Sequence, residues 1–473
     1  MDKKITLFPL TMLIIGALLG GGVFDLMQNM ATNAGPVAIA IAWGITALGM
    51  LSFVLVFQRL AQKRPDLKAG IFHYAQEGFG DYMGFNAAWG YWLSVFIGNV
   101  AYAGMLFSAL SYFFPIFGDG TNIWSIVAAS ALIWLLYLLI LKGVHTAAFV
   151  NSIITAVKPL VPILFILIVF FAFKYDIFAA DIWGKTTGLS LWEQINSTMQ
   201  TAVWVFTGIE GAVLFSGRAK HMKDVGRAGM LALFLIVLLY VLISILSIGV
   251  MSRSELADLQ TPAMAYVLES VVGKWGAILV NIAVIISILG ALLAWTLFAS
   301  ELPYQAALSG AFPRIFAKEN AYAAPKNALL ITTICIQIFL ATFLVTDQVY
   351  RLGLALSTSA ILLPYALTMF YQLKVSLDMT HTAQGKIGDI CLGIVASFYA
   401  CYLIYAGGLD YFLLTTFAYA IGLFVYGWMR KREGKPLFVG YEGWLALVII
   451  LLAGLCVYRI MAGQLDLGAL LRA

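Results

Sequence analysis

Charge is scarce in this sequence. Only 11% of its 473 residues are Asp, Glu, Lys or Arg, whereas 62% are hydrophobic, and the mean hydropathy is +0.94. A soluble globular protein does not have this composition. Apolar segments of about 20 residues recur, and this length crosses the hydrocarbon core of a bilayer. The sequence therefore predicts a membrane protein with many spans, and Met1 to Lys4 runs into the first of them without a cleavage site for a leader peptide.

Several kinds of reactive site are also missing. The four cysteines lie in apolar segments without ligand spacing, and none of the four histidines belongs to a His-Glu-x-x-His pattern. We therefore expect reduced packing cysteines, no metal site and no cofactor. The sequence shows no catalytic constellation, which argues against an enzyme. It also lacks a glycine-rich nucleotide loop with its lysine, which argues against ATP-driven transport.

Thirteen apolar segments are long enough to span a bilayer. Their predicted ranges are 7–31, 36–58, 83–114, 122–141, 146–173, 192–217, 227–251, 273–300, 327–345, 350–373, 387–407, 410–429 and 442–463. A cytoplasmic N-terminus places 20 of the 28 lysines and arginines on the cytoplasmic side and seven on the other, with Lys158 inside a span. This bias predicts a multi-pass protein of the cell (plasma or inner) membrane with a cytoplasmic N-terminus, and it explains the basic loops without a nucleic-acid partner.

The first span is interrupted by three consecutive glycines, Gly20, Gly21 and Gly22, which Asp25 follows. Each glycine costs a helix about 1 kcal/mol relative to alanine, and an intramembrane carboxylate is expensive unless it works or is paired. A broken helix exposes amides and carbonyls, which a membrane protein tolerates only around a cavity. The run therefore predicts the floor of a transport site.

A second break, at Thr207, Gly208 and Glu210, lies in the sixth span, which enters the membrane from the opposite side. Broken helices at matching positions of two oppositely oriented five-span halves are typical of inverted-repeat secondary transporters. The amides at a half-helix N-terminus suit a carboxylate, and the carbonyls at a C-terminus suit an ammonium group. The two breaks together therefore suit an amino acid substrate.

Several motifs carry a family resemblance. Residues 16–24, 204–210 and 290–296 resemble the amino acid–polyamine–organocation superfamily, and within it the basic amino acid/polyamine antiporters. Four more motifs are similar to the arginine:ornithine antiporters and to exchangers of an amino acid for its decarboxylated amine (histidine for histamine, tyrosine for tyramine). These motifs are 28–31, 78–85, 87–92 and 215–219, and the resemblance extends over about residues 5–430.

The resemblance implies an all-α membrane fold of leucine-transporter type, a 5+5 inverted repeat with broken helices 1 and 6 and additional C-terminal helices. One transmembrane domain, 1–473, would then contain a first repeat at about 5–174, a second at about 190–374 and accessory helices at about 385–463. The thirteenth span lies beyond the family core and has no predicted role.

The resemblance also assigns substrate-binding residues. The amides of Gly20–Gly22 would hold the substrate carboxylate, although three small residues could also serve close helix packing. Asn99 would hydrogen-bond the substrate or a neighbouring helix. Trp204 and Trp295 match aromatic gates, and an indole face attracts a cation by about 0.5–2 kcal/mol. The predicted substrate-binding set is completed by Thr207, Gly208 and Ser357.

Three intramembrane charges have roles that the sequence leaves open. Asp25 departs from the family pattern, and it could pair with a substrate ammonium or with Lys158, or reach water. Glu210 suits a gate or a proton-linked site, but it could also hold the broken helix by a hydrogen bond. By resemblance, Lys158 stands where sodium-coupled relatives bind sodium and ties span five to span one. It could also carry a proton or extend to the cytoplasmic face.

These observations predict a secondary antiporter that exchanges a cationic amino acid, or another amino acid, for a related metabolite by alternating access. Arginine/ornithine and histidine/histamine are candidate pairs, and tyrosine/tyramine stays open because tyramine also carries an ammonium group. The alternatives are a proton-coupled symporter that uses Lys158 or Glu210, and a channel or nutrient sensor on the same fold. Amino acids, amines and the lipid bilayer are the expected partners, and a homodimer is compatible with the sequence.

Overall fold

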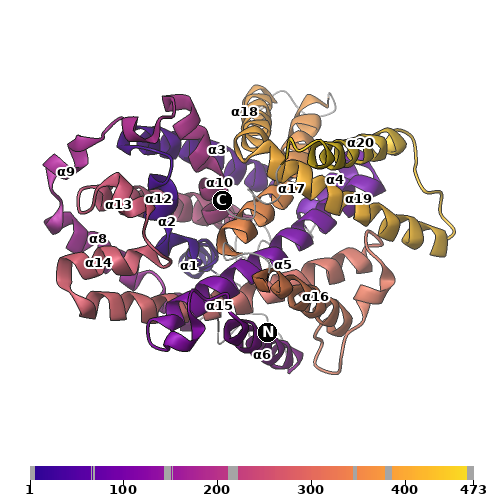
Figure 1. Cartoon of the computed structure of the whole chain (residues 1–473). Coiled ribbons are helices and arrows are strands. Elements are labelled where there is room, and N and C mark those ends of the chain that lie inside the picture. Colours follow the sequence, from indigo (N-terminus) through magenta and orange to yellow (C-terminus); the bar gives the residue numbers. More distant parts are fainter. Residues whose placement is uncertain are drawn as a thin grey trace. The chain divides into compact units, whose positions relative to one another are not determined.

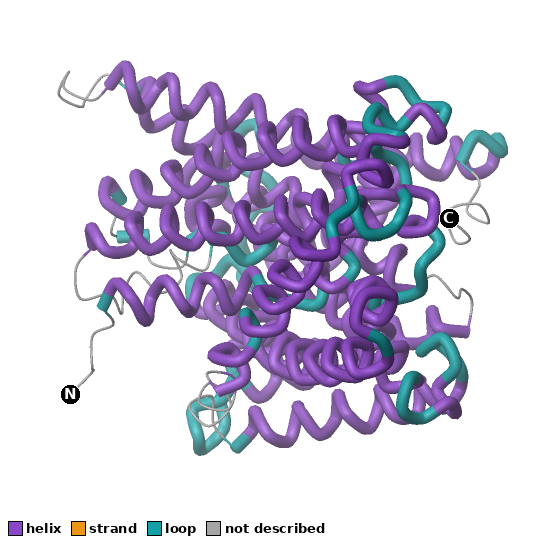
Figure 2. Tube along the Cα trace, turned by 90° about the vertical axis from the view of Figure 1, so that its left-hand side faces the viewer, coloured by secondary structure: helices purple, strands orange, loops and turns teal. Residues whose placement is uncertain are grey.

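The structure is a computed structural model that describes residues 6–64, 66–67, 70–142, 151, 153–210, 222–344, 349–378 and 386–465. Within these ranges every regular element is a helix, and Figure 2 shows the purple helices joined by teal loops. The predicted all-α class is confirmed.

Eleven helices in the described part of the chain are long and apolar enough to cross a membrane. They are α3 (Pro36–Lys63), α5 (Asp81–Ser111), α6 (Ile123–Leu141), a helix over Ile153–Ala172 that contains α8 (Leu160–Ala172), α12 (Met222–Ile248), α15 (Lys274–Leu308), α16 (Lys326–Phe339) continued by η6 (Leu340–Leu344), α17 (Val349–Leu377), α18 (Lys386–Ala406), α19 (Leu409–Arg432) and α20 (Glu442–Met461). These helices coincide with predicted spans two to five and seven to thirteen. The protein is therefore a multi-pass membrane protein.

The first and sixth predicted spans are the two for which glycines predict a break. The first is divided into α1 (Leu7–Leu18), the single turn η1 (Gly22–Phe24) and α2 (Leu26–Ala31). In the sixth, α10 (Leu191–Phe206) ends in a turn over residues 207–210, and residues 211–217 lie outside the described ranges. Both breaks therefore fall where the glycine runs place them.

The spanning helices differ in what covers them. Among the eleven, α5 and α17 are the most buried, whereas the helix 153–172 and α20 expose most of their surface. The exposed side chains there are apolar, for example Phe171 on α8 and Trp444 on α20. A helix that is apolar on its exposed side belongs against lipid rather than water.

Short helices connect the spans. They are α4 (Ile71–Phe79), η2 (Pro115–Phe117), α9 (Tyr175–Ala180), η3 (Lys185–Thr187), α13 (Arg253–Ala257), α14 (Ala263–Val272) and η5 (Arg314–Ala317). Among the described helices, two begin with a capping box: Ser190 with Glu193 at α10, and Ser252 with Glu255 at α13. Each box satisfies amides that the first turn of a helix leaves without partners.

The chain packs as two compact units. Unit 1 comprises Met1–Val54, Tyr102–Ala129 and Ala148–Ala294, and unit 2 comprises Leu55–Ala101, Ser130–Ala147 and Trp295–Ala473. In unit 1, α12 packs against α1 and α2, drawn in indigo in Figure 1. In unit 2, α17 packs against α4, α18 and α19. Each unit takes residues from both predicted repeats, so the repeat boundaries stay a prediction.

Candidate functional site

The break in the first span is a short stretch of irregular backbone inside unit 1. Helix α1 ends as the amide of Leu19 bonds the carbonyl of Ile15 at 2.8 Å, and the amide of Gly20 turns back to the carbonyl of Leu18 at 2.9 Å. The hydrogen bonds between described residues include none from the amides of Gly21 and Gly22, both of which are buried. Buried amides require an acceptor. These two are therefore available to a ligand.

Side chains crowd all three glycines from unit 1. A Cβ on Gly20 would collide with the hydroxyl of Tyr102, and one on Gly21 would lie 2.7 Å from the sulfur of Met105. One on Gly22 would lie 2.8 Å from the indole of Trp204. Close packing on the glycines is thus observed, since glycine lets the two aromatic rings approach the backbone here, while the binding role of the amides stays a prediction. The rings of Tyr102 and Trp204 are themselves 5.3 Å apart.

The break after α10 has a different geometry. Gly208 has φ +107°, a conformation that favours glycine because other residues would strain there. Its amide donates to the carboxylate of Glu210 at 3.1 Å, and the hydroxyl of Thr207 donates to the carbonyl of Val203 at 3.0 Å. Glu210 is buried and holds the turn by this bond. Its proton-linked role stays a prediction, and Gly211 lies outside the described residues.

Tyr240 on α12 joins the two breaks within unit 1. Its hydroxyl lies 2.8 Å from the carbonyl of Leu18 at the end of α1 and 3.2 Å from that of Val205 at the end of α10. A hydroxyl has one proton, so it donates to one carbonyl at a time. Tyr240 is not among the site residues that the sequence predicts. The available signal was a tyrosine inside an apolar span, because a buried phenol needs a hydrogen-bond partner.

Lys158 contacts the last turn of α1. Its ammonium donates to the carbonyl of Gly16 at 3.3 Å, and the side chain is buried. Thr155 packs so closely on Gly16 that a side chain there would collide with it. Carbonyls at a helix C-terminus attract a cation. The lysine thus connects span five to span one, while its role in transport stays a prediction.

Asp25 contacts the chain itself. Its carboxylate accepts the amide of Ala263, the first residue of α14, at 2.7 Å, and the side chain is fully buried. A negative charge is favoured at a helix N-terminus. Gln28 on α2 also donates to the carbonyl of Leu259, which lies between α13 and α14. The predicted pairing of Asp25 with a substrate ammonium stays a prediction beside this structural contact.

Arg253 hydrogen-bonds the C-terminal end of α2. Its guanidinium donates to the carbonyls of Ala31 and Thr32 at 2.9 and 3.3 Å, and it pairs with Asp181 at 3.2 Å. Together with Asp25 and Gln28 it attaches α2 to residues 253–272. Nothing in the sequence indicates this attachment, because an arginine in a polar loop has many ordinary roles.

The other predicted residues belong to unit 2. Asn99 on α5 donates to the hydroxyl of Thr296 on α15 at 3.3 Å, and its buried side-chain oxygen has no hydrogen-bond partner among the described residues. Ser357 on α17 donates to the carbonyl of Ser94 at 2.7 Å. The ring of Trp295 lies 5.5 Å from that of Phe298. Asn99 thus bonds a neighbouring helix and keeps an acceptor available for a ligand.

The family described as amino acid permease matches residues 5–410. The chain belongs to this family. The permease is therefore a transport protein of the amino acid–polyamine–organocation superfamily and not an enzyme. In the described residues no group of three or more His, Cys, Asp or Glu side chains could hold a metal ion.

Curated relatives match over nearly the whole permease. It is 44% identical to the arginine/ornithine antiporter of Pseudomonas aeruginosa, covering 98% of this chain and 99% of that protein. It is 43% identical to a putative arginine/ornithine antiporter of Escherichia coli strain K12, with 92% and 94% covered. It is 39% identical to the arginine/agmatine antiporter of Chlamydia caviae, with 96% of each chain covered.

Two solved structures share the fold. MhsT in complex with L-phenylalanine has a TM-score of 0.55 at 12% identity, covering 85% of this chain and 98% of that one. A nucleobase-cation-symport-1 family transporter, closed with bromovinylhydantoin bound, has a TM-score of 0.53 at 16% identity, with 94% and 96% covered. At such identities the likeness concerns the fold, which is the predicted leucine-transporter type.

Proposed function

We propose that this permease is an antiporter that exchanges arginine for a related cationic metabolite, with ornithine first and agmatine second. The observation that carries the proposal is the glycine break in unit 1, where the buried amides of Gly21 and Gly22 donate to no described residue. A carboxylate is the acceptor that suits adjacent amides beside a half-helix. An amino acid supplies that carboxylate.

The rings beside the break favour a cationic substrate. Tyr102 and Trp204 border the glycines, and an aromatic face attracts a guanidinium or ammonium group. The names of the relatives support the same class, since they are antiporters of arginine with ornithine or agmatine. Histidine with histamine is the next pair to test, because its members also combine an ammonium with a planar ring.

Exchange also fits the fixed charge at Lys158. Its ammonium lies at the carbonyl of Gly16, at the C-terminal end of α1. A cation supplied by the protein makes a dissolved sodium ion unnecessary there. We therefore expect transport without sodium, driven by the counter-substrate.

Counterflow in proteoliposomes tests the exchange. Vesicles are loaded with ornithine, agmatine, histamine, tyramine or buffer, and uptake of radiolabelled arginine is followed with and without external sodium. We expect rapid uptake with internal ornithine, slow uptake into buffer-filled vesicles and no effect of sodium. Equal uptake into loaded and buffer-filled vesicles would exclude strict exchange.

Proton-coupled symport is the second candidate, because the acidic Glu210 and the basic Lys158 are both buried in unit 1. It requires that a pH gradient, acidic outside, concentrates arginine in vesicles without counter-substrate. Glu210→Gln should then abolish the gradient-driven uptake and leave counterflow intact. Uptake that ignores the gradient would remove this candidate.

The orientation of the chain is also a proposal. The basic residues favour a cytoplasmic N-terminus in the inner membrane, and thirteen spans then place the C-terminus on the opposite side. Reporters fused to the two ends, one active only in the cytoplasm and one active only outside it, test this. Both ends reporting the same side would contradict the odd number of spans.

A further inference from the structure

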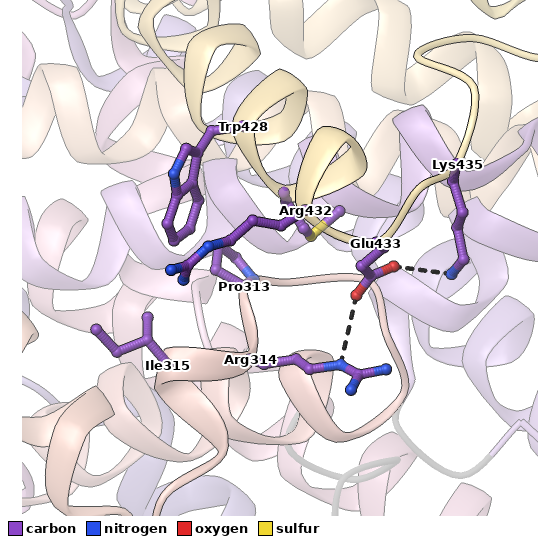
Figure 3. Close-up of a pocket in the computed structure, with 8 residues that line it drawn as sticks. Pro313, Arg314, Ile315, Trp428, Arg432, Glu433 and Lys435 are labelled. Carbon is purple, nitrogen blue, oxygen red and sulfur yellow. Dashed lines mark ion pairs between the residues drawn. The ribbon is translucent and has the colours of Figure 1, made fainter.

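A cavity of about 400 Å³ lies in unit 2 at the C-terminal end of α19, and none of its lining residues belongs to the predicted substrate-binding or gating residues (Figure 3). One wall comes from α19 and the residues that follow it, and the other comes from η5 and the proline before it. The lining residues are Pro313, Arg314, Ile315, Trp428, Met429, Arg432, Glu433 and Lys435.

The cavity carries an excess of positive charge. Three cationic side chains line it, and Glu433 is the one acidic residue among the lining. The Glu433 carboxylate lies 3.7 Å from Arg314 and 2.8 Å from Lys435, as the dashed lines in Figure 3 show. The guanidinium of Arg432 lies 4.8 Å from the ring of Trp428 instead. One carboxylate cannot neutralise three cations, so the cavity suits an anion.

Apolar surface leads into the same cavity. Phe417, Ile421, Phe424 and Trp428 recur every three or four residues on α19, and all four are exposed, Phe424 by 80%. This spacing places them on one face of a helix that crosses the membrane. Ile315 adds an exposed apolar side chain on the η5 wall. An occupant of the cavity therefore meets cations at one end and a lipid-facing stripe at the other.

We propose that this cavity binds the headgroup of an anionic phospholipid, whose acyl chain lies along the exposed stripe of α19. Arginine guanidinium groups match the geometry of phosphate oxygens, and basic pockets at the cytoplasmic ends of spanning helices hold anionic headgroups. Arg314 and Arg432 supply the phosphate contacts, and Lys435 adds a point charge. A free anion lacks the apolar part that the stripe would cover.

Glu433 competes with the phosphate. Its carboxylate pairs with Arg314 and Lys435, so a headgroup must displace it from at least one of them. Removing the charge of Glu433 makes both Arg314 and Lys435 available to the lipid phosphate. The proposal therefore requires opposite effects from changing the cations and from changing the acid.

Two exposed lysines provide a matched control. Lys318 follows η5 and Lys431 precedes Arg432, but neither lines the cavity. Changing both to alanine removes the same charge, from the same two segments of the chain, as changing Arg314 and Arg432. All four side chains are exposed, so folding should survive either double change. The comparison separates a site from the general attraction of a basic surface.

The experiment uses native mass spectrometry of the purified full-length protein, titrated with dioleoylphosphatidylglycerol, dioleoylphosphatidylcholine or inorganic phosphate. We expect one tightly retained phosphatidylglycerol. The Arg314→Ala/Arg432→Ala variant should weaken it by about fivefold for each cation lost. The Lys318→Ala/Lys431→Ala variant should change it less than twofold, and Glu433→Gln should strengthen it.

Each opposite result overturns the proposal in a specific way. An equal loss of phosphatidylglycerol affinity in the two double variants would mean that the basic surface attracts the lipid in general. Phosphatidylcholine retained as well as phosphatidylglycerol would mean that the cavity does not distinguish lipids by headgroup charge. Displacement of the lipid by inorganic phosphate would mean a free-anion site. Loss of a dimer, rather than of lipid, in the Arg314→Ala/Arg432→Ala variant would mean that a second copy covers the cavity.

Discussion

The two halves of the first span are held by different kinds of contact. The end of α1 is held through its carbonyls by Lys158 and Tyr240, which both belong to spanning helices. In contrast, α2 is fastened through Asp25, Gln28 and Arg253 to the short helices α13 and α14 and the loop between them. Both halves pack against α12. We infer that α2 moves with residues 253–272, while α1 moves with the helix 153–172.

The glycine run joins these differently held halves. Segments that change their backbone angles between two rigid elements act as hinges. Gly20, Gly21 and Gly22 lie between α1 and α2, and the amides of Gly21 and Gly22 donate to no described residue. A substrate carboxylate bound there would contact the hinge itself. Binding and movement of the two halves would then be coupled.

The largest effect on transport is expected from adding a side chain to a glycine of the hinge. Gly22→Ala places a Cβ 2.8 Å from the Trp204 indole, and Gly21→Ala places one 2.7 Å from the Met105 sulfur. We expect either change to reduce arginine counterflow more than tenfold, because the indole or the thioether must shift away from its place beside the amides that we propose bind the substrate carboxylate. Gly44→Ala on α3 is the control, since a Cβ there meets open space. Normal counterflow in Gly22→Ala would show that the indole can move freely.

Removing the Tyr240 hydroxyl should have the next largest effect. Tyr240→Phe keeps the ring but removes the donor to the carbonyls of Leu18 and Val205. Leu18 still accepts the amide of Gly20, so the loss is that of one hydrogen bond, about 0.5–1.5 kcal/mol. We expect a lower thermal unfolding temperature and a several-fold loss of counterflow. Tyr458→Phe, at an exposed position on α20, should change neither. An unchanged unfolding temperature in Tyr240→Phe would mean that water replaces the hydroxyl.

Removing the contacts of α1 and of α2 in separate variants should show whether the two halves of the first span are held independently. Arg253→Ala removes the donors to Ala31 and Thr32, and hydrogen bonds to a charged group contribute about 1.5–3 kcal/mol. In hydrogen–deuterium exchange we expect faster exchange in α2 and little change in α1. Lys158→Met should give the reverse pattern.

Lys274→Ala removes an exposed charge at the start of α15 and serves as the control for both variants. If Arg253→Ala speeds exchange equally in α1 and α2, the two halves open together. The inference that a hinge separates α1 from α2 would then be wrong, whereas the hydrogen bonds of Arg253 and Lys158 would not be in question.

The positions of the two helix breaks could be predicted from the sequence, but the residues that contact the helix ends at each break could not. The length of the apolar runs sets the spans, and glycine runs inside them mark Gly20–Gly22 and Gly208, because both signals are local. The partners of Asp25 and Arg253 are not local, since Asp25 meets Ala263 across more than 200 residues. The position of Asp25 inside a span shows that its carboxylate needs a partner, but it does not show which residue the partner is. Pairing Asp25 with Lys158 or with the substrate was therefore as reasonable as the contact with α14.

The smallest expected effect is the pH dependence of the contact that holds α2. Burial by itself would raise the pKa of Asp181, but hydrogen bonds from Thr186 and Arg253 outweigh it and hold the pKa below its ordinary value of 3.8. A lowered pKa in the folded state means that the carboxylate adds stability above this value, and that the contribution is lost as pH falls through the folded-state pKa. The unfolding temperature of the wild type should therefore exceed that of Asp181→Asn at neutral pH, and the difference should disappear under acid conditions below pH 3.8. A difference that persists there would assign the effect of Asp181→Asn to lost packing rather than to charge.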